Sequence, residues 1–100
     1  DFGVPAEVIP NGVDAARFAA APAREEARAR LGWDDRPVVL AVGGIEPRKG
    51  SRTLLAATAR LRAEAPGLVL AIAGGETLFD YADYRAAWED DATRLGVRVH

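Results

Sequence analysis

The sequence predicts an α/β fold in which a parallel β-sheet is flanked by helices. Two short apolar runs, Val38–Val42 and Leu68–Ala73, have the length of strands and lack the alternation of a half-exposed strand. Each run is followed by a glycine pair and then by an amphipathic stretch of helical length. Strands that alternate with helices over short connections are typical of right-handed crossovers between parallel strands.

The composition is that of a small globular protein and excludes several classes of function. The net charge of −2 gives no support to non-specific nucleic-acid binding, which requires a basic surface. No apolar stretch approaches the roughly 18 residues that cross a bilayer, and no secretion leader is visible. The absence of cysteine excludes disulfides and thiolate metal sites. We therefore expect a cytoplasmic setting, with no nucleic acid as partner.

We expect the chain to be a segment of a longer protein. It contains no methionine, and it stops within a predicted strand. A parallel sheet also needs more strands than this sequence supplies. Residues 1–36 are predicted to form a lead-in with a short strand and a short helix, and residues 37–100 the first βαβαβ portion of a domain.

In the lead-in, Ala6–Pro10 is predicted to be a short strand that ends at the turn pair Asn11-Gly12. A turn of helix is expected at Asp14–Phe18. Pro22–Leu31 predicts a short helix, because proline suits a first turn, the acidic residues lie near its start and the arginines near its end.

The domain itself opens with Val38–Val42, which is predicted to be buried on both faces because its apolar run shows no alternation. A helix from Ser51 to about Glu64 follows and ends before Pro66-Gly67. Residues at helical spacing give this helix one face toward the sheet, namely Leu54, Thr58, Leu61 and Ala65, with Leu55 and Ala59 beside them.

Leu68–Ala73 is predicted to be a second strand that is again buried on both faces. A second helix begins near Asp80 or Asp83 and reaches about residue 95, where a glycine ends it before a third strand. We interpret Tyr84 and Trp88 on this helix as core residues. The acidic run at residues 89–91 is interpreted as a solvated helix face and not as a metal site.

The sharpest functional signal is the turn between the first strand and the first long helix, which reads GGIEPRKGS. Gly43 and Gly44 end the strand, and Lys49, the only lysine among 13 basic residues, stands at the start of the helix. Amide groups at a helix start and a nearby cation both favour an anion. The turn therefore predicts a phosphate site.

Two common phosphate motifs do not fit this turn. The dinucleotide fingerprint G-x-G-x-x-G is absent, because the next glycine after Gly44 is Gly50. The Walker pattern places lysine after glycine, whereas Lys49 precedes Gly50 here. A nicotinamide-binding domain and a P-loop are both disfavoured.

Two stretches of the chain together resemble retaining glycosyltransferases of family 4, which have the GT-B fold. Val42–Gly50 (VGGIEPRKG) is similar to their donor-site loop, which usually reads G-R-x-x-x-x-K-G, and Val8–Asp14 (VIPNGVD) is similar to a segment shortly before it. The spacing to the second strand and the start of the third also match. The resemblance spans essentially the whole chain and implies part of the C-terminal, Rossmann-like, donor-binding domain.

The resemblance implies that Lys49 contacts the diphosphate of a nucleotide-sugar donor and that Gly43 and Gly44 allow its close approach. The sequence departs from the family at Gly44, where an arginine is usual, so one of two cationic contacts is missing. Arg48 is a candidate to compensate for it. The resemblance implies no catalytic residue in this segment and no metal ion or other cofactor.

Other residues are candidates for lining the same cleft. Gly74, Gly75 and Glu76 follow the second strand, and loops at strand C-termini line ligand crevices in open α/β sheets. A plain turn explains them equally well. Asn11 and Gly12 form either a tight turn or, as in the family, an edge of the interdomain cleft.

We therefore expect part of an enzyme that transfers a sugar from a nucleoside diphosphate to an unknown acceptor with retention. The longer protein is expected to be cytoplasmic, either free or peripheral to a membrane, and the segment alone inactive. The alternative is a non-catalytic α/β module that binds an anionic ligand or a protein partner. The isolated chain is also expected to self-associate through an exposed strand edge.

Overall fold

The computed structural model describes residues 3–74 and 80–100, so Gly75 and Glu76 lie outside the described residues. The chain divides into two compact units, Asp1–Asp34 and Asp35–His100. In the described part of the chain, no helix is both long enough and apolar enough to span a bilayer.

The first unit contains two short helices, α1 (Ala15–Ala19) and α2 (Arg24–Arg30). Both agree with the predicted helical stretches. Asp14 caps α1, because its Oδ1 accepts a hydrogen bond from the Arg17 amide at 3.2 Å.

The strand predicted at Ala6–Pro10 is wrong, because these residues have no regular secondary structure. A strand needs a partner for its backbone N–H and C=O groups, and the described residues of this unit contain no other strand. The side chains of Val8 and Ile9 are accordingly 91% and 82% exposed.

The second unit is a three-stranded parallel sheet with flanking helices, which confirms the predicted Rossmann-like α/β class. The strands lie in the order β1-β2-β3, and Val38 of β1 pairs with Val69 of β2. The elements in chain order are β1 (Val38–Val42), the 3₁₀ turn η1 (Pro47–Lys49), α3 (Ser51–Leu61), β2 (Val69–Ala73), α4 (Ala82–Arg94) and β3 (Arg98–Val99).

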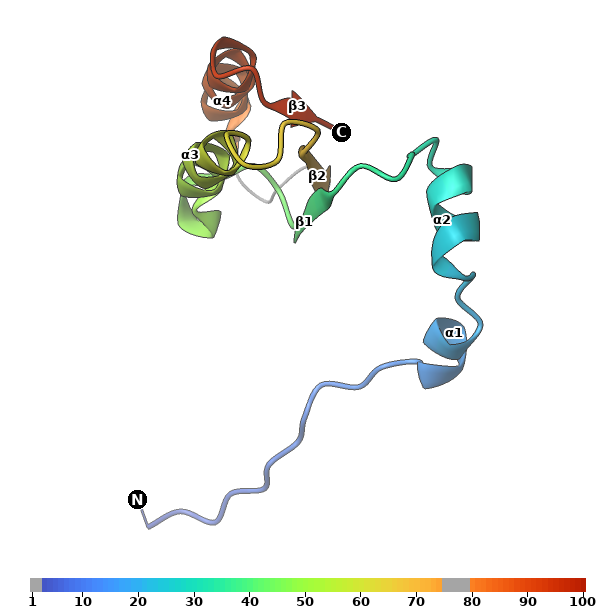
Figure 1. Cartoon of the computed structure of the whole chain (residues 1–100). Coiled ribbons are helices and arrows are strands. Elements are labelled where there is room, and N and C mark those ends of the chain that lie inside the picture. Colours follow the sequence, from blue (N-terminus) through green and yellow to red (C-terminus); the bar gives the residue numbers. More distant parts are fainter. Residues whose placement is uncertain (1–2, 75–79) are drawn as a thin grey trace. The chain divides into compact units, whose positions relative to one another are not determined.

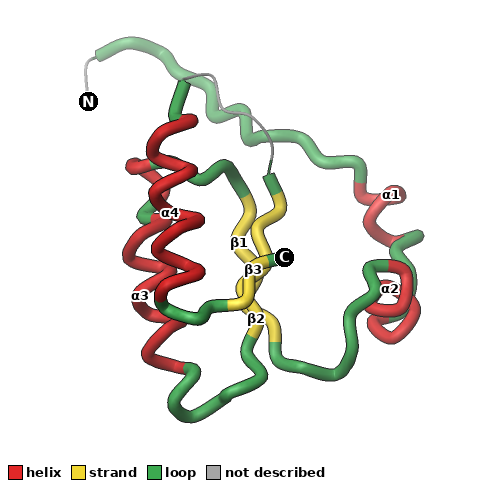
Figure 2. The backbone as a smooth tube through the Cα atoms, turned by 90° about the horizontal axis from the view of Figure 1, so that it is seen from above, coloured by secondary structure: helices red, strands yellow, loops and turns green. Residues whose placement is uncertain are grey.

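Both long helices, α3 and α4, cover the same face of the sheet (Figures 1 and 2). The strand order advances in one direction, so successive right-handed crossovers place their helices on one side. The prediction that β1 is buried on both faces is therefore wrong: Leu40 and Val42 are 57% and 77% exposed. The prediction holds for the central strand, where Val69–Ala71 is buried.

A core of five buried residues lies between the helices and the sheet: Leu55, Leu70, Trp88, Ala92 and Val97. Trp88 is fully buried, and its indole Nε1 donates a hydrogen bond to the Ser51 carbonyl at 2.9 Å. This bond joins the middle of α4 to the first residue of α3.

The face predicted for α3 is largely the observed one, since Leu54 and Ala59 pack against the core, but Leu61 departs from it. Ser51, Leu55 and Thr58 are buried, whereas Leu61 is 48% exposed. At about 100° per residue, Leu61 points about 120° away from Leu55, so both cannot face the sheet.

Replacing Trp88 with phenylalanine is expected to destabilise the chain by about 1–3 kcal/mol, because the substitution removes the indole N–H and leaves a buried carbonyl without its donor. Urea denaturation followed by circular dichroism measures this loss. Trp33→Phe is the matched control, since Trp33 is only partly buried and belongs to the other unit. Equal, small effects of the two substitutions would contradict the role given to Trp88.

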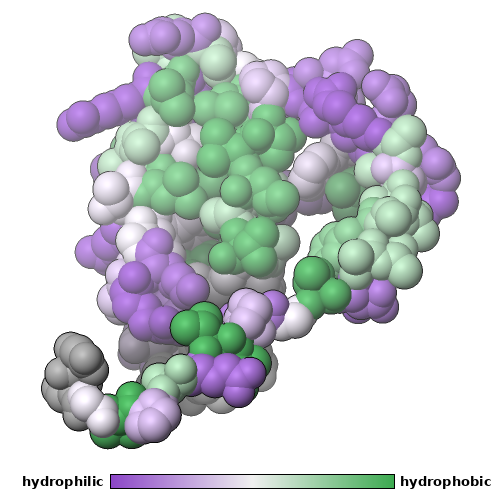
Figure 3. Space-filling model, turned by 90° about the horizontal axis from the view of Figure 1, so that it is seen from below, coloured by the Kyte–Doolittle hydropathy of each residue, from purple (hydrophilic) through white to green (hydrophobic). Residues whose placement is uncertain are grey.

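Strand β1 is also an edge strand, with two exposed apolar side chains, Leu40 and Val42. The view from below in Figure 3 shows a patch of hydrophobic residues on the surface. An exposed apolar edge favours pairing with another molecule. We predict that the 100-residue chain elutes from a sizing column as a dimer or larger species.

The double substitution Leu40→Lys and Val42→Lys should shift this elution toward the monomer, because charged side chains on an edge strand oppose its pairing with another chain. Leu61→Lys, at an exposed leucine of α3, serves as the control and should change nothing. A wild-type chain that stays monomeric and melts at high temperature would contradict the prediction.

Candidate functional site at the glycine turns

The glycine turns that follow β1 and β2 meet in space. The Gly43 amide donates a hydrogen bond to the Ala73 carbonyl at 2.9 Å. A Cβ atom added to Gly74 would lie 2.1 Å from the Gly43 carbonyl oxygen, so only glycine fits at this position. The structure therefore brings Gly43, Gly44 and Gly74 together at one edge of the sheet, and their part in ligand binding stays a prediction.

The side chain of Lys49 folds back over the carboxyl end of β1. Gly43 has a φ of +131°, a backbone angle that residues with a side chain rarely adopt. A Cβ atom added to Gly43 would lie 3.6 Å from the Lys49 Cε and 3.8 Å from its Nζ. Within the described residues, the Lys49 ammonium makes no ion pair. A cation thus stands directly beside the glycine turn.

Arg48 has a different environment, because its guanidinium is paired with a buried carboxylate. The Arg48 Nε lies 2.9 Å from the Glu46 Oε1, and the Glu46 side chain is only 1% exposed. A buried carboxylate is costly without a partner, so it holds the arginine close. The charge of Arg48 is therefore largely compensated within the turn itself.

Ser51 fixes the shape of the turn. Its hydroxyl donates to the Glu46 carbonyl at 3.2 Å and accepts from the Glu46 amide at 3.3 Å. The Lys49 amide donates to the same Glu46 carbonyl at 3.2 Å, which closes η1. Since Ser51 is also bonded to Trp88, the turn is anchored to the core.

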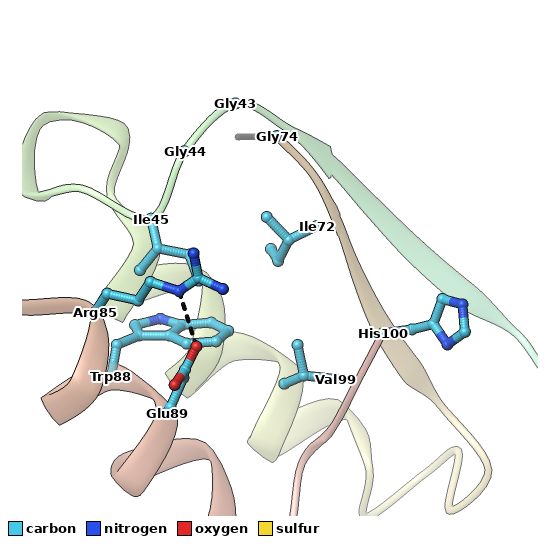
Figure 4. Close-up of a pocket in the computed structure, with 10 residues that line it drawn as sticks. All are labelled: Gly43, Gly44, Ile45, Ile72, Gly74, Arg85, Trp88, Glu89, Val99 and His100. Carbon is cyan, nitrogen blue, oxygen red and sulfur yellow. Dashed lines mark hydrogen bonds and ion pairs between the residues drawn. The ribbon is translucent and has the colours of Figure 1, made fainter. Parts of the chain in front are cut away.

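A hollow of about 180 Å³ opens beside the turns at the carboxyl ends of the strands (Figure 4). Crevices at this end of an open α/β sheet are the usual ligand sites. The hollow is lined by Gly43, Gly44, Ile45, Ile72, Gly74, Arg85, Trp88, Glu89, Val99 and His100.

Two charged residues that line this hollow were not predicted from the sequence to belong to the site. Arg85 and Glu89 lie on the first two turns of α4, and the Arg85 Nε is 2.9 Å from the Glu89 Oε1. Their spacing of four residues is the one signal that could have paired them. The interpretation of residues 89–91 as a solvated face fits Glu89 and Asp90, which are exposed, whereas Asp91 is partly buried and pairs with Arg94 at 2.9 Å.

Two candidates from the sequence lie outside the unit that holds the hollow. Asn11 and Gly12 belong to the first unit, where both are exposed. Their place at a cleft stays a prediction. Among the described residues, no three histidine, cysteine, aspartate or glutamate side chains are grouped to hold a metal ion.

The chain is similar to several known glycosyltransferases. It is 41% identical over 95 residues to a GDP-mannose-dependent α-(1-6)-phosphatidylinositol monomannoside mannosyltransferase of Mycolicibacterium smegmatis, covering 94% of this chain and 23% of that protein. It is 52% identical over 60 residues to a D-inositol 3-phosphate glycosyltransferase of Kineococcus radiotolerans, covering 59% and 14%.

A mannosyltransferase of Mycobacterium tuberculosis (strain H37Rv) with the same name as the first relative is 41% identical over 70 residues, covering 69% of this chain and 18% of that protein. The chain thus spans less than a quarter of the length of these relatives. No solved structure shows a significant match. The family model described as glycosyl transferases group 1 matches residues 23–92, so the chain belongs to the group 1 glycosyltransferase family.

Proposed function

We propose that this chain is part of the donor-binding, C-terminal domain of a retaining family 4 glycosyltransferase with the GT-B fold. The longer protein would transfer a sugar from a nucleoside diphosphate to an acceptor. The observation that carries the proposal is the Lys49 side chain, which folds over Gly43 at the carboxyl end of β1. Gly43 lines the hollow, whereas Lys49 itself is not among the lining residues.

The proposed task of Lys49 is electrostatic. When the glycosidic bond to the donor breaks, negative charge grows on the departing diphosphate, and a fixed cation beside it stabilises that state. Lys49 makes no ion pair within the described residues, so its charge is available to a ligand. Arg48 is less suited to this task, because Glu46 holds its guanidinium.

The donor is proposed to be a nucleoside-diphosphate sugar, and GDP-mannose is the first to test. Two of the relatives described above are named as GDP-mannose-dependent mannosyltransferases. The glycines that meet at the strand ends support this class of ligand, since they leave the backbone open to close approach. The acceptor stays open.

Lys49→Ala in the longer protein is expected to weaken binding of GDP at least tenfold. A hydrogen bond to a charged group contributes about 1.5–3 kcal/mol, and about 1.4 kcal/mol corresponds to tenfold in affinity. Isothermal titration calorimetry with GDP, UDP and ADP measures this change, and Lys49→Arg should retain part of the affinity.

The control for this experiment is Arg60→Ala, which removes an exposed cation in the last turn of α3, at the opposite end of the helix from Lys49. It should leave the affinity unchanged. If none of the three nucleotides bound, or if Lys49→Ala bound them as tightly as the wild type, the donor-site proposal would be wrong.

A further inference from the structure

A diphosphate carries more than one negative charge, so a site with one cation leaves part of that charge uncompensated. Three arginines lie near the turn, in η1, α3 and α4. Arg48 is paired with Glu46, and the Arg52 guanidinium lies 5.5 Å from the centre of the Tyr84 ring. Both are engaged with other side chains, whereas Lys49 makes no ion pair within the described residues; Arg48, Arg52 and Lys49 are not among the lining residues of the hollow.

Arg85 is the arginine that does line the hollow, together with Gly43 and Gly44. Figure 4 shows its side chain extending from α4 toward the hollow, with a dashed line to Glu89. The side chains of Arg85 and Glu89 are 60% and 54% exposed, so a ligand in the hollow can reach the guanidinium.

We propose that Arg85 is the second cation of the donor site and binds phosphate oxygens of the donor diphosphate together with Lys49. The inference rests on the proposed function, because it assigns a further residue to that same ligand. Glu89 is then the partner that holds Arg85 over the hollow while the site is empty.

The exchange of partners is energetically easy. An exposed ion pair at a spacing of four residues on a helix is worth about 0.3–0.5 kcal/mol. A guanidinium can form two parallel hydrogen bonds to a phosphate, and such charge-assisted pairs are roughly twice as strong as neutral ones. Arg85 therefore loses little from Glu89 and gains more from the ligand.

Arg85 lies near the start of α4, where the carboxylate of Asp80 already accepts a hydrogen bond from the Ala82 amide at 3.1 Å. The proposed contact with the donor therefore rests on the Arg85 side chain and not on the helix terminus. The competing explanation is a purely structural pair that stabilises α4. Arg94 and Asp91 form such a pair on the same helix at 2.9 Å, away from the hollow.

The test is isothermal titration of GDP into the longer protein with Arg85→Ala and, as the matched control, Arg94→Ala. Both variants lose an exposed ion pair of α4, but only the first loses a lining residue of the hollow. We expect at least a tenfold loss of GDP affinity for Arg85→Ala and less than a twofold change for Arg94→Ala. Thermal melts of both variants report on folding.

Two further measurements test whether Arg85 contacts the phosphates of GDP. Guanosine has no phosphate, so Arg85→Ala should leave guanosine binding unchanged. Glu89→Gln should retain or increase GDP affinity, because it frees the Arg85 guanidinium. The slope of GDP affinity against salt should become shallower in Arg85→Ala, since one phosphate contact is lost.

The inference is overturned if Arg85→Ala and Arg94→Ala have the same small effect, or if Arg85→Ala weakens guanosine as much as GDP. Its failure is distinguishable from failure of the donor site itself. If Lys49→Ala weakens GDP binding while Arg85→Ala does not, only the role of Arg85 is wrong. If neither changes binding, the donor-site proposal fails as well.

Discussion

The hydrogen bond from the buried Trp88 indole to the Ser51 carbonyl connects the fold to the site. It ties α4 to the first residue of α3 in the centre of the core. The hydroxyl of the same serine bonds both backbone groups of Glu46, so it also sets the shape of the turn that carries Lys49. Through these hydrogen bonds, the buried Ser51 connects the packed core to the turn of the proposed ligand site.

The turn places its two neighbouring cations, Arg48 and Lys49, in different environments. Glu46 is buried and holds Arg48, whereas Lys49 lies over a glycine that leaves room for it. Burying a carboxylate costs free energy, and the attraction between Glu46 and the Arg48 guanidinium offsets part of this cost. The same ion pair holds the loop in one geometry. A turn fixed in this way can present one cation to a ligand without reorganising, which is what electrostatic stabilisation of a leaving group requires.

The sequence was sufficient for the architecture of the second unit, because apolar runs and glycine punctuation determine its strands and helices. It left open whether Gly74 borders the same cleft as Gly43 and Gly44 or forms a plain turn; the structure places the three glycines together, because carboxyl ends of parallel strands share one edge. The uncovered face of β1 was missed because an apolar run does not reveal on which side the crossovers place their helices. Arg85 was missed because its distance from the turn depends on how α4 packs, which spacing along the chain cannot give.

A crystal structure of the longer protein with GDP bound would test the central claim most directly. We expect diphosphate oxygens at about 2.7–3.2 Å from the Lys49 Nζ and from the Arg85 guanidinium, with Arg48 still paired to Glu46. A diphosphate bound away from the glycine turns, or one held by Arg48 after its separation from Glu46, would contradict the account.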